Sequence, residues 1–262
     1  MLDIRGASPG LLDDPLLLEV GGAPPNAALT WRARLRDDDG FVWRAAAPTS
    51  EGLSTAWVPA KPTAGPVAAL RSLRPFDVDV RVEGTDGAAS SRTITRRLTG
   101  DGVRARRWRD DLAGTLYLPA ETTGAALILD ARPSPSPPDA PRASSRDDAT
   151  PERVVETSLD APDDGGAAGG ATHAPIAAAL LASRGVLAFV LTGGKGDVIA
   201  ATRERLAQIP GTPQEIVALA AAAVPVPAGV GLRGEDQKGA IARAAAWDGL
   251  LKRLDARPRV TR

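Results

Sequence analysis

The stretch Val230-Gly231-Leu232-Arg233-Gly234-Glu235-Asp236-Gln237-Lys238-Gly239 is the part of the chain from which the fold is best inferred. It opens with a short apolar run and ends in a turn rich in glycine and charge. Residues 240–254 then carry apolar side chains at helical spacing, among them Trp247 and Leu250. The pattern predicts a strand, a tight turn and a long helix.

Composition excludes several classes of function. The 262 residues contain 32 Lys and Arg and 32 Asp and Glu, so the formal net charge is zero, which argues against nucleic acid or an anionic membrane as the main partner. There is no cysteine, hence no disulfide and no thiol nucleophile. Without a cysteine pair or a metal-ligand cluster, we expect no metal. The alanine-rich runs are too short to span a bilayer and no signal peptide is recognisable, so we expect a cytoplasmic protein.

The first 110 residues have the pattern of an all-β domain. Apolar residues alternate with polar ones over 29–36 and again over 76–83, and turn signals recur between them. Short strands at this spacing predict an immunoglobulin-like β-sandwich. The cationic positions of the first run, Arg32, Arg34 and Arg36, could form a ligand face. The strict alternation favours the solvated face of an antiparallel sheet.

Four arginines surround Trp108 in the stretch 102–109. A phosphate-binding cluster is conceivable, because acyl carriers such as coenzyme A bear phosphates. Nothing specific for an anion accompanies these arginines, so a solvated strand or a linker is the preferred interpretation.

From residue 111 onward the pattern changes to strands that alternate with helices, which predicts a mostly parallel sheet. We expect the boundary near residues 100–112, dividing the chain into domains 1–110 and 111–262. The expected strands are 114–119, 125–129, 186–191 and 230–232, and the expected helices are 174–183, 197–208, 213–223 and 240–254. Proline, serine, aspartate and glycine dominate 131–172, which predicts a flexible insertion.

Several segments in this order resemble the acyl-CoA thioesterase / bile acid-CoA:amino acid N-acyltransferase family. They are Asp14-Pro15-Leu16-Leu17-Leu18-Glu19-Val20, Leu29-Thr30-Trp31-Arg32-Ala33-Arg34-Leu35-Arg36, Gly114-Thr115-Leu116-Tyr117-Leu118-Pro119 and Ala178-Ala179-Leu180-Leu181-Ala182-Ser183-Arg184-Gly185-Val186. The resemblance implies a β-sandwich followed by a three-layer α/β-hydrolase-like domain, here in a degenerate or shortened member. It also implies acyl-CoA as a substrate and a place in fatty acid metabolism.

The resemblance implies acyl transfer by a Ser or Cys nucleophile, a His base and an acidic residue. Lys238-Gly239-Ala240 matches the residues after the nucleophile, which puts Gln237 in the nucleophile's place, and glutamine cannot serve there. No histidine follows this turn; the chain's single histidine is His173. The glycine-rich loop that would hold the oxyanion after Leu129 is replaced by Asp130-Ala131-Arg132-Pro133-Ser134-Pro135, and proline lacks the required N–H.

These residues favour a catalytically impaired family member, a pseudoenzyme. An active hydrolase could instead use Asp236 as the nucleophile or His173 as a base in a rearranged site. A further alternative is phosphate binding by Thr192-Gly193-Gly194-Lys195-Gly196-Asp197, although the spacing departs from the P-loop pattern. A non-catalytic protein-binding or scaffold module is also open, because a strand at 259–261 would leave a sheet edge through which copies could associate.

Overall fold

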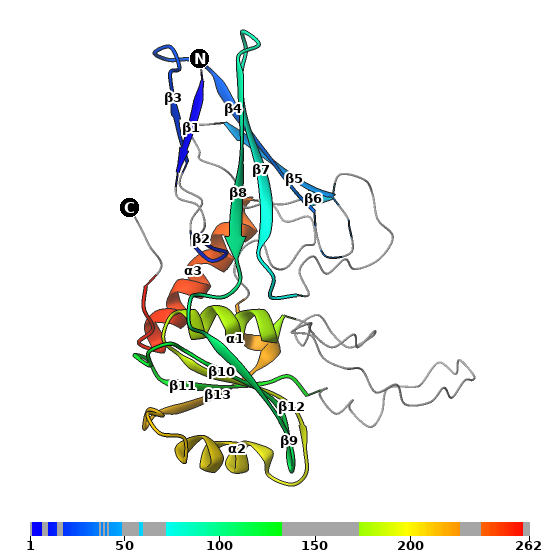
Figure 1. Ribbon diagram of the computed structural model, residues 1–262, viewed down its shortest axis with the longest axis vertical. Helices are drawn as coiled ribbons and strands as arrows, with labels where there is room; N and C mark the ends of the chain where they lie inside the picture. The colour runs from blue at the N-terminus through cyan, green and yellow to red at the C-terminus, as the bar shows by residue number, and fades with distance from the viewer. Residues whose placement is uncertain are drawn as a thin grey trace, which may run out of the picture.

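The computed structural model describes residues 2–6, 10–14, 18–36, 38, 40, 42–48, 58–59, 72–132, 173–225 and 237–258. Strands dominate, and they form two main sheets that lie one above the other in Figure 1. The strands are β1 (Asp3–Gly6), β2 (Gly10–Leu11), β3 (Leu18–Gly21), β4 (Leu29–Arg36), β5 (Val42–Pro48), β6 (Val58–Pro59), β7 (Phe76–Gly84), β8 (Ala89–Arg97), β9 (Arg104–Arg109), β10 (Leu112–Leu118), β11 (Ala126–Asp130), β12 (Leu187–Gly194) and β13 (Ile216–Ala220). The helices are α1 (Ala174–Ser183), α2 (Val198–Ala207), α3 (Gln237–Arg253) and the short 3₁₀ turn η2 (Ala221–Ala223).

The first main sheet has the order β2-β8-β7-β4-β5-β6 and is antiparallel except between β2 and β8. Trp31, Ala33 and Leu35 of β4 are buried, whereas Arg32 and the other arginines of this strand are exposed. The same alternation holds in β7. The predicted solvated arginine face is therefore confirmed as an exposed face of an antiparallel sheet.

A separate two-stranded sheet, β1 paired with β3, contributes Ile4 to the core that the first main sheet forms with its inner face. Arg92 on β8 donates a hydrogen bond to the main-chain oxygen of Ile4 at 3.1 Å, which ties the small sheet to the large one. β-branched and aromatic side chains at alternate positions favour strands. This part of the molecule is β-rich, as its sequence predicts.

The second main sheet has the order β13-β11-β12-β10-β9. β11 is parallel to both β12 and β13, whereas β10 is antiparallel to both β12 and β9. The prediction of a mostly parallel sheet is therefore wrong, because the sheet is mixed. Asp110 and Asp111 alone join β9 to β10, and so short a connection can only produce an antiparallel hairpin.

Helices cover both faces of the second sheet. α1 and α3 lie between the two main sheets and α2 lies on the opposite face (Figure 1). Eight of the ten residues of α1 are buried, and most are alanines, whose small side chains let the helix lie close to its neighbours. The expected helix at 174–183 is confirmed, and the one expected at 240–254 is present as most of α3.

The alanine-rich segment 213–223 is not the helix that its composition predicts. It contains β13 and the turn η2, and β13 pairs with β11 over five residues, from Ile216 opposite Ala126 to Ala220 opposite Asp130. Without β13, the backbone groups on that side of β11 would be buried and unpaired. This tertiary pairing outweighs the helix propensity of alanine.

The stretch 102–109 is largely strand, because β9 forms six paired positions with β10. The chain thus passes from the first main sheet to the second between Arg97 and Arg104. The division into domains 1–110 and 111–262 stays a prediction. The strands expected at 230–232 and 259–261, and the insertion from residue 133 to 172, lie outside the described residues.

A buried ion pair connects the start of the chain to the second sheet's helices. Arg184, which follows α1, donates to both carboxylate oxygens of Asp13 at 3.0 and 3.1 Å and to Asp14 at 2.6 Å. Trp247 of α3 donates its indole N–H to Asp13 at 3.0 Å. Burial lowers the pKa of Arg184, but the charges and hydrogen bonds of Asp13 and Asp14 outweigh this and raise it overall. We call these four residues the junction cluster.

Candidate functional site

The parallel strands of the second sheet end along one edge, which is where α/β proteins usually bind ligands. β11 ends at Asp130, β12 at Gly194 and β13 at Ala220. α1 begins at the same edge, because a crossover from β11 to the parallel strand β12 must return through the helix. We refer to these strand ends and the loops that follow them as the carboxyl edge.

Asp130 and Arg132 form a local ion pair at the carboxyl edge. Arg132 donates from Nε to one carboxylate oxygen of Asp130 at 2.8 Å and from Nη2 to the other at 2.7 Å. The hydrogen bond from Arg132 holds the pKa of Asp130 below its ordinary value, against the opposing effect of burial. The pair is about one-third exposed at Arg132 and one-quarter exposed at Asp130, at 34% and 26% of the side-chain surface.

The backbone N–H groups after β11 already have partners. The N–H of Ala131 donates to the main-chain oxygen of Leu191 at 2.9 Å. The N–H of Arg132 donates to Asp130 Oδ1 at 3.2 Å. Pro133 has no N–H to donate. The first three residues of this loop therefore present no free backbone donor with which to hold an oxyanion.

The glycine-rich loop after β12 is a capped connection to α2. Asp197 is the N-cap residue of α2, and its carboxylate accepts a hydrogen bond from the N–H of Ala200 at 3.1 Å. Gly196 has φ 72°, a left-handed conformation that glycine adopts without strain. A carboxylate at the helix start repels an anion there, which counts against phosphate binding by this loop.

The three predicted catalytic residues are described to different extents. His173 immediately precedes α1 and is half-buried; its side chain does not cap the helix, and its main-chain oxygen accepts from the N–H of Ala177 at 2.9 Å. Gln237 is the first residue of α3, but nothing is described of its side chain. Asp236 lies outside the described residues. A catalytic role for any of the three stays a prediction.

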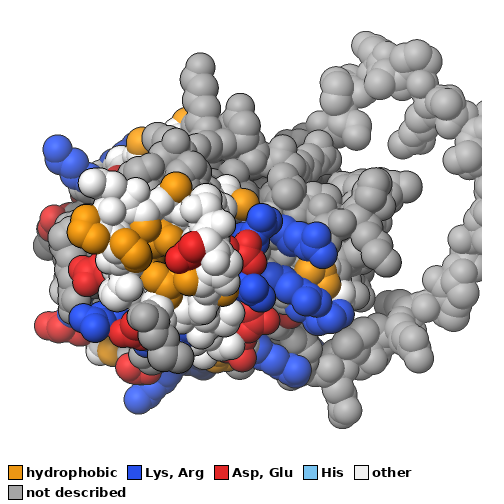
Figure 2. Space-filling view, turned by 90° about the horizontal axis from the view of Figure 1, so that it is seen from above, with side chains coloured by type: hydrophobic (Ala, Val, Ile, Leu, Met, Phe, Trp, Pro, Cys, Tyr) orange, Lys and Arg blue, Asp and Glu red, His pale blue; other side chains and the backbone are white. Residues whose placement is uncertain are grey.

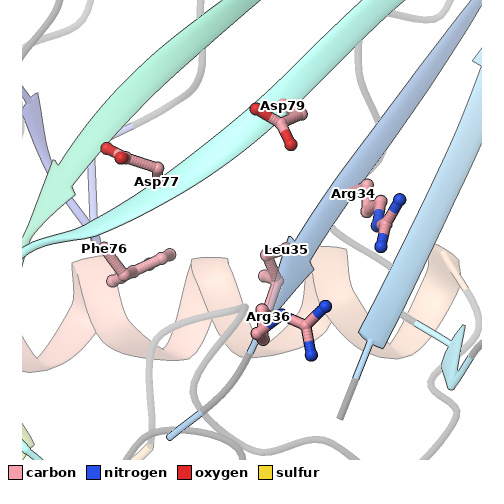
Figure 3. A pocket seen from close by; sticks show the side chains of 6 residues that line it. All are labelled: Arg34, Leu35, Arg36, Phe76, Asp77 and Asp79. Carbon is pink, nitrogen blue, oxygen red and sulfur yellow. The ribbon is translucent and has the colours of Figure 1, made fainter. Parts of the chain in front are cut away.

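A hollow of about 460 Å³ lies on the first main sheet, where β4 and β7 end their pairing. Figure 3 shows the side chains that line it, which are Arg34, Leu35, Arg36, Phe76, Asp77 and Asp79. Asp77 and Asp79 each accept a hydroxyl hydrogen bond from β8, from Thr95 and Thr93 respectively, both at 2.8 Å. The alternation over 29–36 and 76–83 predicts these charged positions, but it does not predict a hollow where β4 and β7 end their pairing.

The charges around this hollow are of both signs. Figure 2, seen from above, shows basic and acidic side chains next to each other on one side of the molecule. Arg34 of β4 is paired with Asp79 of β7 in the strand register. The basic lining residues therefore come from β4 and the acidic ones from β7. All four charged lining residues are exposed, as expected of a solvated sheet face. The hollow belongs to the first main sheet, whereas the carboxyl edge belongs to the second.

Within the described ranges, no three His, Asp or Glu residues are grouped so as to hold a metal ion. Among the same residues, no helix combines the length and apolar character needed to cross a membrane.

Comparison with known proteins provides no family for this chain. No protein-family model matches it, and no curated protein is significantly similar to it.

Proposed function

We propose that this protein is an acyl-CoA thioesterase-like protein that binds an acyl thioester but carries out little or none of the family's acyl transfer. Its fold would be an immunoglobulin-like β-sandwich followed by a shortened α/β-hydrolase-like domain. The second domain would bind the acyl thioester at the carboxyl edge. The protein would act in fatty acid metabolism as a binding protein and not as a hydrolase.

The order of the two main sheets along the chain supports this fold. An antiparallel sheet with one exposed face comes first, and a mixed sheet with helices on both faces follows it. The parallel strands β11, β12 and β13 are connected through helices, so their carboxyl ends share the edge at which such sheets bind ligands.

The occupied N–H groups after β11 are the observation on which impaired chemistry rests. Acyl transfer by an α/β-hydrolase uses an N–H from this loop to stabilise the oxyanion of the tetrahedral intermediate. In this chain, Ala131 and Arg132 direct their N–H groups to Leu191 and Asp130. Loss of one oxyanion donor lowers kcat by roughly 10²- to 10³-fold in enzymes where it has been removed.

The experiment is to measure the release of free coenzyme A from short- to long-chain acyl-CoAs. We expect no release above the rate without protein, and we expect saturable binding of at least one acyl-CoA by calorimetry. Turnover that is lost in Asp236→Asn would contradict this proposal and identify Asp236 as a nucleophile. Gln237→Ala is the matched control, because it changes the neighbouring position that has no nucleophilic group.

Binding and turnover separate the remaining alternatives. If acyl-CoA neither binds nor reacts, the acyl thioester part of the proposal fails and a protein-binding role is left. If acyl-CoA binds without reacting, Gln237→Ser tests whether a nucleophile alone restores activity. We expect this variant to stay inactive, because neither a histidine after the turn nor an N–H of residues 131–133 is available to it.

A further inference from the structure

One of the two edge strands of the second main sheet, β9, is strongly basic. β9 pairs with β10 on one side, and no described strand lies on its other side. Four of its six residues are arginine, and every residue except Trp108 is exposed. The strand therefore combines an open backbone edge with a high density of positive charge.

Most of this charge has no partner in the described part of the chain. Arg104, Arg106 and Arg107 make no hydrogen bond and no ion pair with the described residues. The acidic residue next to the strand, Asp110, is bound to Arg205 of α2 at 2.6 Å. The three guanidinium groups are thus available to an anionic partner.

β9 is held firmly by the sheet beneath it. Trp108 is 7% exposed, and the centroid of its ring lies 4.8 Å from that of Phe189 on β12. The guanidinium carbon of Arg205 lies 4.6 Å from the centroid of Trp108, a cation–π contact. An edge fixed in this way loses little conformational entropy when a partner binds to it.

The backbone of β9 can accept another strand. In an antiparallel pair, alternate residues direct their N–H and C=O groups away from the neighbour, and at an edge these groups are open to a further strand. A second copy of β9 is a poor partner, since arginines would then face arginines. The charge that disfavours self-association favours a strand rich in aspartate and glutamate.

We propose that β9 is a docking edge for an acidic, extended segment of another protein, which adds to the sheet as a further strand. Arg104 and Arg106 lie on the same face of the sheet as Trp108, and Arg107 and Arg109 lie on the opposite face, by strand alternation. A partner with carboxylates at successive positions would meet an arginine on both faces. The main-chain hydrogen bonds would supply affinity and the ion pairs would supply selectivity.

The test uses a fluorescent, end-capped peptide in which pairs of adjacent glutamates alternate with pairs of threonines, so that carboxylates lie on both faces of the added strand. Fluorescence anisotropy measures its binding to the full chain, and hydrogen exchange measures the protection of amides 104–109. We expect saturable binding and slower exchange in β9. The variant Arg106→Glu/Arg107→Glu should weaken binding by at least roughly tenfold, from two cross-strand charge pairs reversed in sign. Arg203→Glu, an exposed position on α2, is the matched control and should bind normally.

A second peptide separates strand pairing from simple charge attraction. It carries the same glutamates with proline in place of threonine, so it has no N–H at those positions to pair with β9. Equal binding of the two peptides, or equal competition by inorganic polyphosphate, would overturn strand pairing. Unchanged binding by the charge-reversal variant, with an unchanged thermal midpoint, would overturn the assignment to β9. Arg106→Gln/Arg107→Gln replaces that variant if it fails to fold.

Discussion

Two arginine–aspartate ion pairs in this molecule have similar geometry and very different surroundings. In the junction cluster, Arg184 meets Asp13 from a position 171 residues away in the sequence, and the two side chains are 6% and 0% exposed. At the carboxyl edge, Arg132 meets Asp130 two residues away, and both side chains are partly exposed. Both pairs are bidentate.

The difference shows that an ion pair's surroundings decide what it can do. The junction pair connects the first segment of the chain to α1 and α3, so replacing Arg184 would take the hydrogen-bonded cation away from a buried carboxylate. The carboxyl-edge pair lies within one loop, and Asp130 also accepts the backbone N–H of Arg132. The junction pair should therefore affect the stability of the fold, and the carboxyl-edge pair should affect the chemistry that the loop can support.

The largest effect is expected from Arg184→Ala. This variant removes the hydrogen-bonded cation from the buried carboxylate of Asp13, which then attracts only Arg96 through space, so we expect a loss of about 3–5 kcal/mol in the free energy of unfolding. Urea denaturation measures the change. Arg257→Ala is the control, because Arg257 pairs with Glu121 at the surface and should lose no more than about 1 kcal/mol. A similar small loss in both variants would remove the distinction between buried and exposed pairs.

A smaller effect is expected from Trp247→Phe. The aromatic ring that fills this buried position is largely kept, but the indole N–H that donates to Asp13 is lost. Removing a hydrogen bond to a charged group costs about 1.5–3 kcal/mol. Urea denaturation of this variant beside Trp108→Phe, whose indole makes a cation–π contact with Arg205, tests whether the bond to Asp13 matters most. Equal losses would argue that packing alone explains both.

At the carboxyl edge, Arg132→Ala should change stability little. A partly exposed ion pair contributes about 0.2–1 kcal/mol, and we expect a loss in this range by urea denaturation. Arg36→Ala, which loses a hydrogen bond to the main-chain oxygen of Gly40, offers an exposed comparison. A loss above about 2 kcal/mol at Arg132 would show that this pair is as structural as the junction pair.

The smallest effect is a dependence on pH. The pKa of Asp130 is lowered in the folded protein from an ordinary value of 3.8, so the ionised group stabilises the fold at pH values above this. This contribution is lost as the pH falls through the lowered folded-state value. The stability difference between the wild type and Asp130→Asn, measured by urea denaturation at several pH values, should therefore shrink below pH 3.8. A difference that stays constant with pH would contradict a role for this ionisation.

Much of the first main sheet can be predicted from the alternation of apolar and polar residues, because one face of the sheet is buried and the other is exposed to solvent. The pattern over β4 and β7 correctly separated inward from outward residues. The predicted bounds of α1 agree with the observed ones, and a proline at the start of a helix and a glycine after its end are typical of such boundaries. The proposed catalytic residues were chosen by resemblance, and only His173 among them has a described side chain.

The errors arose where a neighbour far away in the sequence decides the structure. Local composition favours a helix over 213–223, but β11 requires a strand beside it and Ile216–Ala220 supplies one. The mixed character of the second sheet likewise depends on where the hairpin of β9 and β10 attaches. The apolar run that begins with Ile216 and Val217 is compatible with a strand, but nothing in either segment shows which strand it pairs with.

The sequence by itself determined which residues of β4 and β7 turn inward, where α1 begins and ends, and that the arginines of β4 are exposed. These properties depend on the period of the strand or helix and on local end signals. Only the tertiary structure decided that Arg184 meets Asp13, that β9 is an outer strand, and that the N–H groups after β11 are already bonded. Each of these depends on groups distant in the chain or on the hydrogen bonds that a loop finally forms, and local periodicity carries no information about either.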